Sequence, residues 1–174
     1  KRNEANILEQ PLNIYEVSLE FWKENKEDNK FFDYEKIAEE LPKYVKEMGY
    51  THVEIMPIKR SIDGSGLNEN YLLRNRYEIV EGLKKLIDKL HEADIGVIIA
   101  WDLGHFNKDF GGLYKFDGTS TYEYEEEWRA ENKNLGICNF DLGRPEVQSY
   151  LISNVLYLYR EFHLDGLKMK DVSS

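Results

Sequence analysis

The sequence predicts an α/β fold in which four short strands, separated by amphipathic helices, form a parallel sheet. Residues 95–101 (Ile-Gly-Val-Ile-Ile-Ala-Trp) are almost continuously apolar, which is typical of a parallel strand covered on both faces. Apolar residues recur at helical spacing within 34–48, 83–90 and 147–162. Strand-like and helical segments alternate along the chain, and this order favours right-handed crossovers between parallel strands.

The first half of the chain predicts two strands around one helix. The first strand is expected within residues 12–19, which alternate in character and are rich in β-forming residues. The helix should begin after the candidate N-cap Asp33 and end before Gly49, which stands where a C′ glycine belongs. Pro42 lies inside this helix and predicts a kink or a break. The second strand is expected over residues 52–58.

The second half begins with a Gly- and Asn-rich loop over 61–76, followed by the second helix. The third strand leads into the longest connection, residues 102–144, and a connection of this length predicts a functional loop or an inserted subdomain. Pro145 should open the third helix at its first position, and the fourth strand is expected within 164–172. The residues expected to be buried in the last two helices are Leu83, Leu86, Ile87, Leu90, Val147, Tyr150, Leu151, Val155, Leu158 and Phe162.

Length and charge limit the classes of function. The 174 residues predict a single domain, 1–174, with a polar lead-in at 1–11. The net charge of −10 would repel a phosphate backbone, so no nucleic-acid partner is expected. No run of about 18 apolar residues exists, so no membrane partner is expected either.

Cysteine and histidine usage points to a reduced, metal-free protein. The lone Cys138 cannot form an internal disulfide and favours a reducing compartment, so we expect a cytoplasmic location. His52, His91 and His163 lack the spacing of metal ligands, and we expect no metal and no cofactor.

The fourth strand carries a recognisable motif. Its sequence Asp165-Gly166-Leu167-Lys168-Met169-Lys170-Asp171-Val172 resembles Asp-Gly-Leu-Arg-Val-Asp-Ala-Val, the fourth-strand motif of the α-amylase superfamily, most closely in bacterial 1,4-α-glucan branching enzymes. Further matches lie at 44–57, 116–119, 139–140 and 143–144, so the resemblance covers nearly the whole chain. It implies a (β/α)₈ (TIM) barrel with its active site at the C-terminal ends of the strands. This chain would supply a (βα)₄ half, with a long loop between strand three and helix three.

Several motif positions depart from the family. The resemblance implies that the nucleophilic aspartate of the family is Lys170 here, and that the arginine steadying it is Lys168. The family's third-strand aspartate is Ala100, and the tyrosine that stacks on the reacting sugar is Asn68. His105 matches a family histidine that contacts a sugar hydroxyl.

These exchanges bear directly on catalysis. Retaining glycoside transfer needs two carboxyl groups about 5 Å apart, and an ammonium at the nucleophile position would repel the cationic transition state. Asp171 should face the opposite side of the strand and cannot substitute. We therefore assign no catalytic residue. Lys170 is expected to be a charge left at an inactive site, paired with Asp102; the alternative is a perturbed lysine acting as base or Schiff-base former.

Two functions remain, and the changed motif positions favour the first. In the first, the chain is an inactive branching-enzyme-like domain that binds α-glucan weakly through Trp101, Asp102, His105 and Lys168. In the second, it is the N-terminal part of an active enzyme that transfers α-1,4-glucan segments to α-1,6 positions and lacks its C-terminal half. The open edges of a four-stranded sheet predict a homodimer that completes a barrel. The alternative is that the 102–144 loop covers the open face of a monomer.

Overall fold

The computed structural model describes residues 11–19, 21–22, 34–56, 77–108, 112–132 and 136–170. The chain forms two compact units. The first unit comprises residues 1–56, 73–100 and 162–168, and the second comprises 57–72, 101–161 and 169–174. The predicted loop at 61–76 with Asn68 lies outside the described residues, as do Asp171 and most of the lead-in.

The main sheet has four strands in the order β1-β2-β3-β7. Strands β1 (Ile14–Val17), β2 (His52–Ile55) and β3 (Gly96–Asp102) pair in parallel, and β7 (Gly166–Lys170) lies beside β3. The predicted α/β fold with a parallel sheet is therefore confirmed. The inner strands β2 and β3 are almost wholly buried, as their apolar character predicts.

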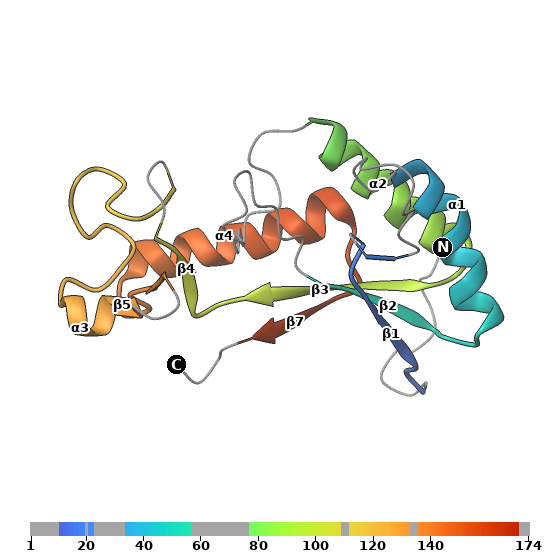
Figure 1. The fold of residues 1–174 in the computed structure, drawn as a ribbon, viewed down its shortest axis with the longest axis horizontal. Coiled ribbons are helices and arrows are strands. Elements are labelled where there is room, and N and C mark those ends of the chain that lie inside the picture. The colour runs from blue at the N-terminus through green and yellow to red at the C-terminus, as the bar shows by residue number, and fades with distance from the viewer. Residues whose placement is uncertain are drawn as a thin grey trace. The chain divides into compact units, whose positions relative to one another are not determined.

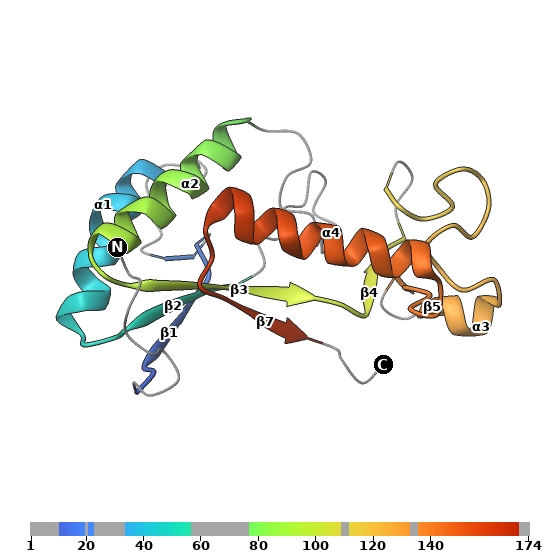
Figure 2. The same ribbon diagram turned by 180° about the vertical axis from the view of Figure 1, so that it is seen from behind.

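Helices α1 (Tyr34–Glu47) and α2 (Tyr77–Glu92) lie side by side in the first unit (Figures 1 and 2). Helix α1 ends just before Gly49, as predicted. Gly49 has φ +77°, its N donates to Lys46 O, and Tyr50 N donates to Val45 O. The buried apolar residues that the structure describes in the two helices are Ile37, Ala38, Leu41, Pro42, Val45, Leu83, Leu86, Ile87 and Leu90.

Of the predicted kink or break at Pro42, the break is wrong, because α1 runs continuously through this residue; the kink stays a prediction. Proline removes one backbone hydrogen bond from the helix. Here the proline ring is itself buried, next to Leu41, in the middle of a buried apolar stripe. Packing on both sides of Pro42 therefore outweighs the local preference to end the helix.

The second unit contains a small antiparallel sheet that the sequence analysis did not assign. Strands β4 (His105–Asn107), β6 (Ile137–Asn139) and β5 (Glu131–Asn132) form it in the order β4-β6-β5. A single turn of helix, α3 (Glu127–Ala130), precedes β5. The long connection at 102–144 therefore carries structure of its own between β3 and α4.

Helix α4 (Pro145–Phe162) begins at Pro145, as predicted. Four of its predicted core residues, Val147, Leu151, Leu158 and Phe162, are buried. Its other side exposes large apolar side chains, namely Ile152, Leu156, Tyr157 and Tyr159. Within the described parts of the chain, no helix has both the length and the apolar character needed to cross a membrane.

Candidate functional site

Lys168 forms an ion cluster with two carboxylates of the main sheet. Its Nζ lies 2.7 Å from Glu54 Oε1 on β2 and 3.1 Å from Glu16 Oε2 on β1. Glu16 and Glu54 are register partners, and the Glu54 side chain is only 8% exposed. The hydrogen bond to Glu54, followed by that to Glu16, raises the pKa of Lys168. One cation thus offsets two acids, and Lys168 stays protonated at neutral pH.

The Lys168 side chain extends across one face of the main sheet to strands that are not next to its own. Among the described strands, β7 is paired with β3 alone, yet its Lys168 side chain meets carboxylates on β2 and β1. Gly166, two residues earlier, makes room for the neighbouring strand, since a Cβ there would lie 3.3 Å from Ile98 Cγ1. A protonated lysine is neither a nucleophile nor a base, so Lys168 itself contributes a fixed positive charge that ties β7 to the carboxylates of β1 and β2.

Asp102 and His105 meet at the corner between β3 and β4 in the second unit. His105 Nε2 lies 2.9 Å from Asp102 Oδ2, and the two side chains are 15% and 11% exposed. Gly104 N donates to Asp102 Oδ1 at 3.2 Å, and Phe140 N donates to Gly104 O. One bond to the Asp102 side chain and one backbone bond therefore close the corner, which holds a carboxylate and an imidazole in one fixed arrangement.

The expected pair between Asp102 and Lys170 is not formed, because Asp102 meets His105 instead. Lys170 O accepts a backbone bond from Leu103 N at 3.4 Å. Its side chain makes no hydrogen bond or ion pair to any residue that the structure describes. By strand alternation it points to the same side of β7 as Lys168. For Asp102, a histidine three residues away in the same closed turn is a nearer partner than a lysine on another strand.

Trp101 lies on the other side of β3 from Asp102 by the same alternation. It is 4% exposed, and its indole Nε1 donates to Asn154 Oδ1 of α4 at 2.9 Å. This contact joins β3 to α4 within the second unit. The role of Trp101 as a sugar ligand stays a prediction, as do those of Asp102, His105 and Lys168.

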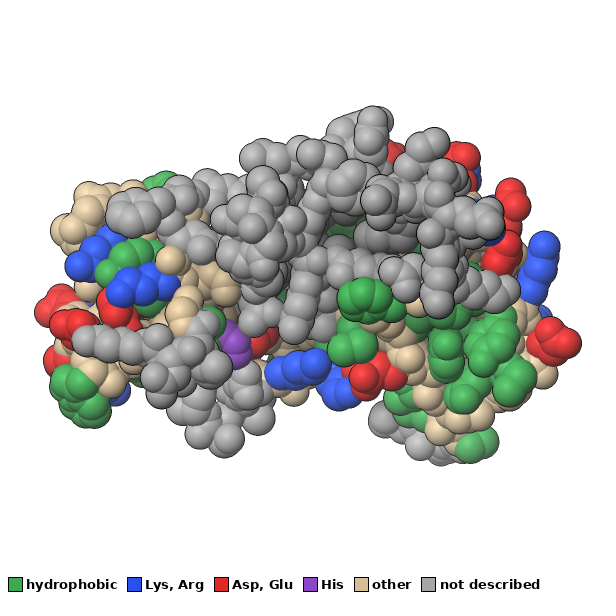
Figure 3. Space-filling view, in the orientation of Figure 1, with side chains coloured by type: hydrophobic (Ala, Val, Ile, Leu, Met, Phe, Trp, Pro, Cys, Tyr) green, Lys and Arg blue, Asp and Glu red, His purple; other side chains and the backbone are tan. Residues whose placement is uncertain are grey.

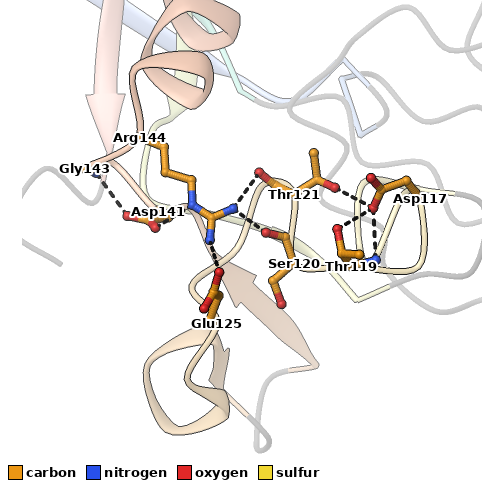
Figure 4. A network of polar contacts seen from close by, with 8 residues as sticks. All are labelled: Asp117, Thr119, Ser120, Thr121, Glu125, Asp141, Gly143 and Arg144. Atoms are coloured by element: carbon orange, nitrogen blue, oxygen red, sulfur yellow. Dashed lines mark hydrogen bonds and ion pairs between the residues drawn. The ribbon is translucent and has the colours of Figure 1, made fainter.

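Arg144 is the centre of a polar network that orders the loop before α4 (Figure 4). Its Nε lies 2.9 Å from Asp141 Oδ2, and its Nη2 lies 3.5 Å from Glu125 Oε1. Its Nη1 donates to the backbone carbonyls of Ser120 and Thr121. One guanidinium, 28% exposed, therefore joins three separate stretches of the 102–144 connection.

Asp117 organises the adjoining turn, also drawn in Figure 4. Its Oδ1 accepts hydrogen bonds from Thr119 Oγ1, Thr121 Oγ1 and Thr119 N, at 2.7, 2.8 and 2.9 Å. These bonds, led by that of the Thr119 hydroxyl, lower the pKa of Asp117 to about 2. The stability that they supply is present above the ordinary pKa of 3.8 and is lost as pH falls towards 2.

The antiparallel sheet buries two acids that sequence reasoning missed. Glu123 is 1% exposed and accepts a hydrogen bond from Lys115 N, while Glu131 accepts one from Tyr114 and pairs with Lys108. Burial, reinforced by the charges of Glu123 and Glu131, raises the pKa of the fully buried Cys138 thiol to about 12.

Both acids also take part in antiparallel pairing. Glu123 bridges to Phe140, and Glu131 is opposite Cys138. Neither position has a spacing that would mark it in the sequence. Among the described residues, no three His, Cys, Asp or Glu side chains gather so as to hold a metal ion.

No protein-family model matches the chain. Known proteins that match it in sequence do so over its whole length. The chain is 53% identical over 178 residues to 1,4-alpha-glucan branching enzyme GlgB 1 of Clostridium perfringens (strain 13). It is 49% identical over 178 residues to GlgB of Francisella tularensis subsp. novicida (strain U112). The whole of this chain is covered in both cases, but only 26% and 28% of the relatives. The chain thus spans about a quarter of their length.

Solved structures with the same fold are more distant in sequence. A maltogenic alpha-amylase, AmyB from Thermotoga neapolitana, matches 93% of this chain and 39% of its own, with a TM-score of 0.69 and 21% identity. The alpha-amylase of Geobacillus thermoleovorans, complexed with acarbose, matches 91% of this chain and 40% of its own, with a TM-score of 0.68 and 20% identity. At these identities the likeness concerns the fold alone.

Proposed function

We propose that this chain, which belongs to the bacterial 1,4-alpha-glucan branching enzyme family, is an α-glucan-binding domain without catalytic activity of its own. The chain spans about a quarter of its curated relatives, so the branching activity in their names does not pass to it directly. The chain is about half identical to these branching enzymes over its whole length, which supports an α-glucan as its class of ligand.

Lys170 is the observation that carries the proposed inactivity. It ends β7, at the position where the family resemblance implies the nucleophilic aspartate. A cation there cannot attack an anomeric carbon and disfavours an oxocarbenium-like transition state. The neighbouring Lys168 is held protonated by Glu54 and Glu16 and cannot replace a carboxylate.

The Asp102–His105 pair supports weak glucan contact. A carboxylate and an imidazole, held 2.9 Å apart, can both form hydrogen bonds with sugar hydroxyls. Their low exposure limits how much of a sugar they can reach, which is why we propose weak rather than tight binding.

Incubation with amylose should leave both the iodine absorbance and the number of reducing ends unchanged. Lys170→Asp should also give no turnover, because one restored carboxylate lacks the second that glycoside transfer needs. Clostridium perfringens GlgB 1 is the positive control for the assay. Branching by this chain that disappears in Asp102→Asn would show that Asp102 acts as a catalytic carboxyl and would refute the proposal.

We further propose that the chain self-associates through the edges of its main sheet. Strands β1 and β7 are the two ends of the described four-stranded order, and strand edges with unpaired backbone groups favour pairing with another chain. Leu12, two residues before β1, and Ile14, its first residue, are 53% and 39% exposed. Figure 3 shows hydrophobic side chains gathered on the face that carries β1.

Light scattering coupled to size exclusion should report twice the 20.6 kDa mass of the chain. Ile14→Lys should shift this species towards the monomer, because a charge at the edge of a sheet opposes pairing. Met48→Lys, at a comparably exposed apolar residue beyond α1, is the matched control and should leave the dimer intact. A monomer over a wide concentration range would favour the model in which the 102–144 connection covers the open face.

A further inference from the structure

The single helical turn α3 and the residues before it form an aromatic platform, which we define as Tyr124, Trp128 and Arg129. Trp128 and Arg129 are exposed, and Tyr124 is half-buried. Trp128 is 82% exposed, the largest exposed fraction among the large hydrophobic side chains that the structure describes. Arg129 Cζ lies 4.0 Å from the centroid of the Tyr124 ring and 5.9 Å from that of Trp128. The guanidinium is thus within cation–π reach of both rings.

The turn that carries the platform is closed by its own backbone bonds and anchored at its C-terminal end. Arg129 N and Ala130 N both donate to Glu126 O at 2.9 Å, and Asn139 Nδ2 of β6 donates to Arg129 O at 2.7 Å. Ala130 is buried, and the next residue, Glu131, is tied to Lys108 and Tyr114. A ligand meeting Trp128 therefore meets a backbone that is already ordered, which lowers the entropy cost of binding.

The surroundings of Trp128 limit the chemistry of that ligand. Three exposed carboxylates, Glu125, Glu126 and Glu127, precede it, and Figure 3 shows acidic and hydrophobic side chains next to each other at α3. They would repel phosphate and other anions. Arg129 already occupies the cation position against the rings, which disfavours a second cation. A neutral ligand with an apolar face and many hydroxyl donors satisfies both conditions.

We propose that the Tyr124–Trp128–Arg129 platform is a binding surface for α-glucan, in addition to the Asp102–His105 pair. The C–H face of a glucose ring would lie against the indole, and its hydroxyl groups would donate to the flanking carboxylates. This inference rests on the proposed α-glucan function and names where that ligand is held. The partner class that it excludes is a basic peptide attracted by the three glutamates.

Affinity electrophoresis through gels containing amylopectin tests the platform. The wild-type chain should be retarded, and Trp128→Ala should weaken binding about fivefold or more, since a lost aromatic contact of this kind is worth about 1 kcal/mol. Trp128→Phe should retain part of the binding, because it keeps an aromatic face. Phe21→Ala removes another aromatic side chain, 71% exposed, and should leave the mobility shift unchanged.

A second measurement follows the indole itself. Acrylamide should quench Trp128 fluorescence readily in the free protein, and maltoheptaose should protect it. Wild-type retardation that persists in Trp128→Ala would overturn the platform, as would retardation by oligolysine but not by amylopectin.

His105→Ala separates this inference from the function on which it rests. Binding lost in Trp128→Ala but kept in His105→Ala supports the platform and rejects the His105 contact. Binding lost only in His105→Ala rejects the platform and leaves the proposed function standing. Failure of the wild-type chain to bind any α-glucan rejects both.

Discussion

Replacing Asp165 by alanine is expected to lower the free energy of unfolding by about 2–4 kcal/mol, because it leaves a buried donor unpaired and removes a charged acceptor. Asp165 Oδ2 accepts a hydrogen bond from Val97 N at 2.7 Å and lies 2.9 Å from His91 Nε2. In return, Asp165 N donates to Val97 O at 2.9 Å. One carboxylate therefore joins the entry to β7, the start of β3 and the last turn of α2.

Urea denaturation followed by circular dichroism measures this loss. Asp165→Asn should cost less than alanine, because its amide oxygen can still accept from Val97 N. Asp88→Ala, at an exposed position of α2, is the matched control and should change stability by no more than about 0.5 kcal/mol. Equal stability of the wild type and Asp165→Ala would mean that the Asp165–Val97 hydrogen bond contributes nothing to folding.

Replacing Arg144 by methionine should destabilise the second unit by about 2–3 kcal/mol. Methionine keeps most of the apolar stem but removes the guanidinium, so Asp141 and the carbonyls of Ser120 and Thr121 lose a shared donor. Because these partners come from separate parts of the connection, the loss should also loosen the loop before α4 (Figure 4).

Hydrogen exchange and thermal unfolding report the two parts of this prediction. Faster amide exchange is expected at Gly143, Arg144 and the 117–125 loop, together with a lower Tm. Arg160→Met, at an exposed position of α4, is the control and should leave both quantities near those of the wild type. If Arg144→Met and Arg160→Met behave alike, the Arg144 network does not order the loop.

Local patterns are sufficient to predict the main sheet and its helices. The apolar run at 95–101 became β3, Gly49 ends α1, and Pro145 begins α4, because each signal acts through neighbouring backbone. Pro42 is the exception: its local effect is overridden by burial of the residues around it. The strands β4, β5 and β6 are two or three residues long, too short for any periodicity to be visible.

The partners of the candidate site residues could not be predicted, because they are set by the fold. The bond from Lys168 to Glu16 joins residues 152 positions apart, and that from Trp101 to Asn154 spans 53. The Glu123–Glu127 run shows the same limit, since Glu123 is buried while Glu125, Glu126 and Glu127 are exposed. Glutamates in one short segment thus have opposite environments, because Glu123 pairs with Phe140 and the other three do not.

The lone cysteine makes this chain convenient for site-directed labelling. Thiol reagents attack the thiolate, and Cys138 combines full burial with a pKa of about 12, so it should stay silent towards maleimide dyes in the native state. A single cysteine introduced on the surface could therefore carry a fluorophore or spin label without a cysteine-free background. Probes placed on α2 and α4 would then give the distance between the two compact units in solution.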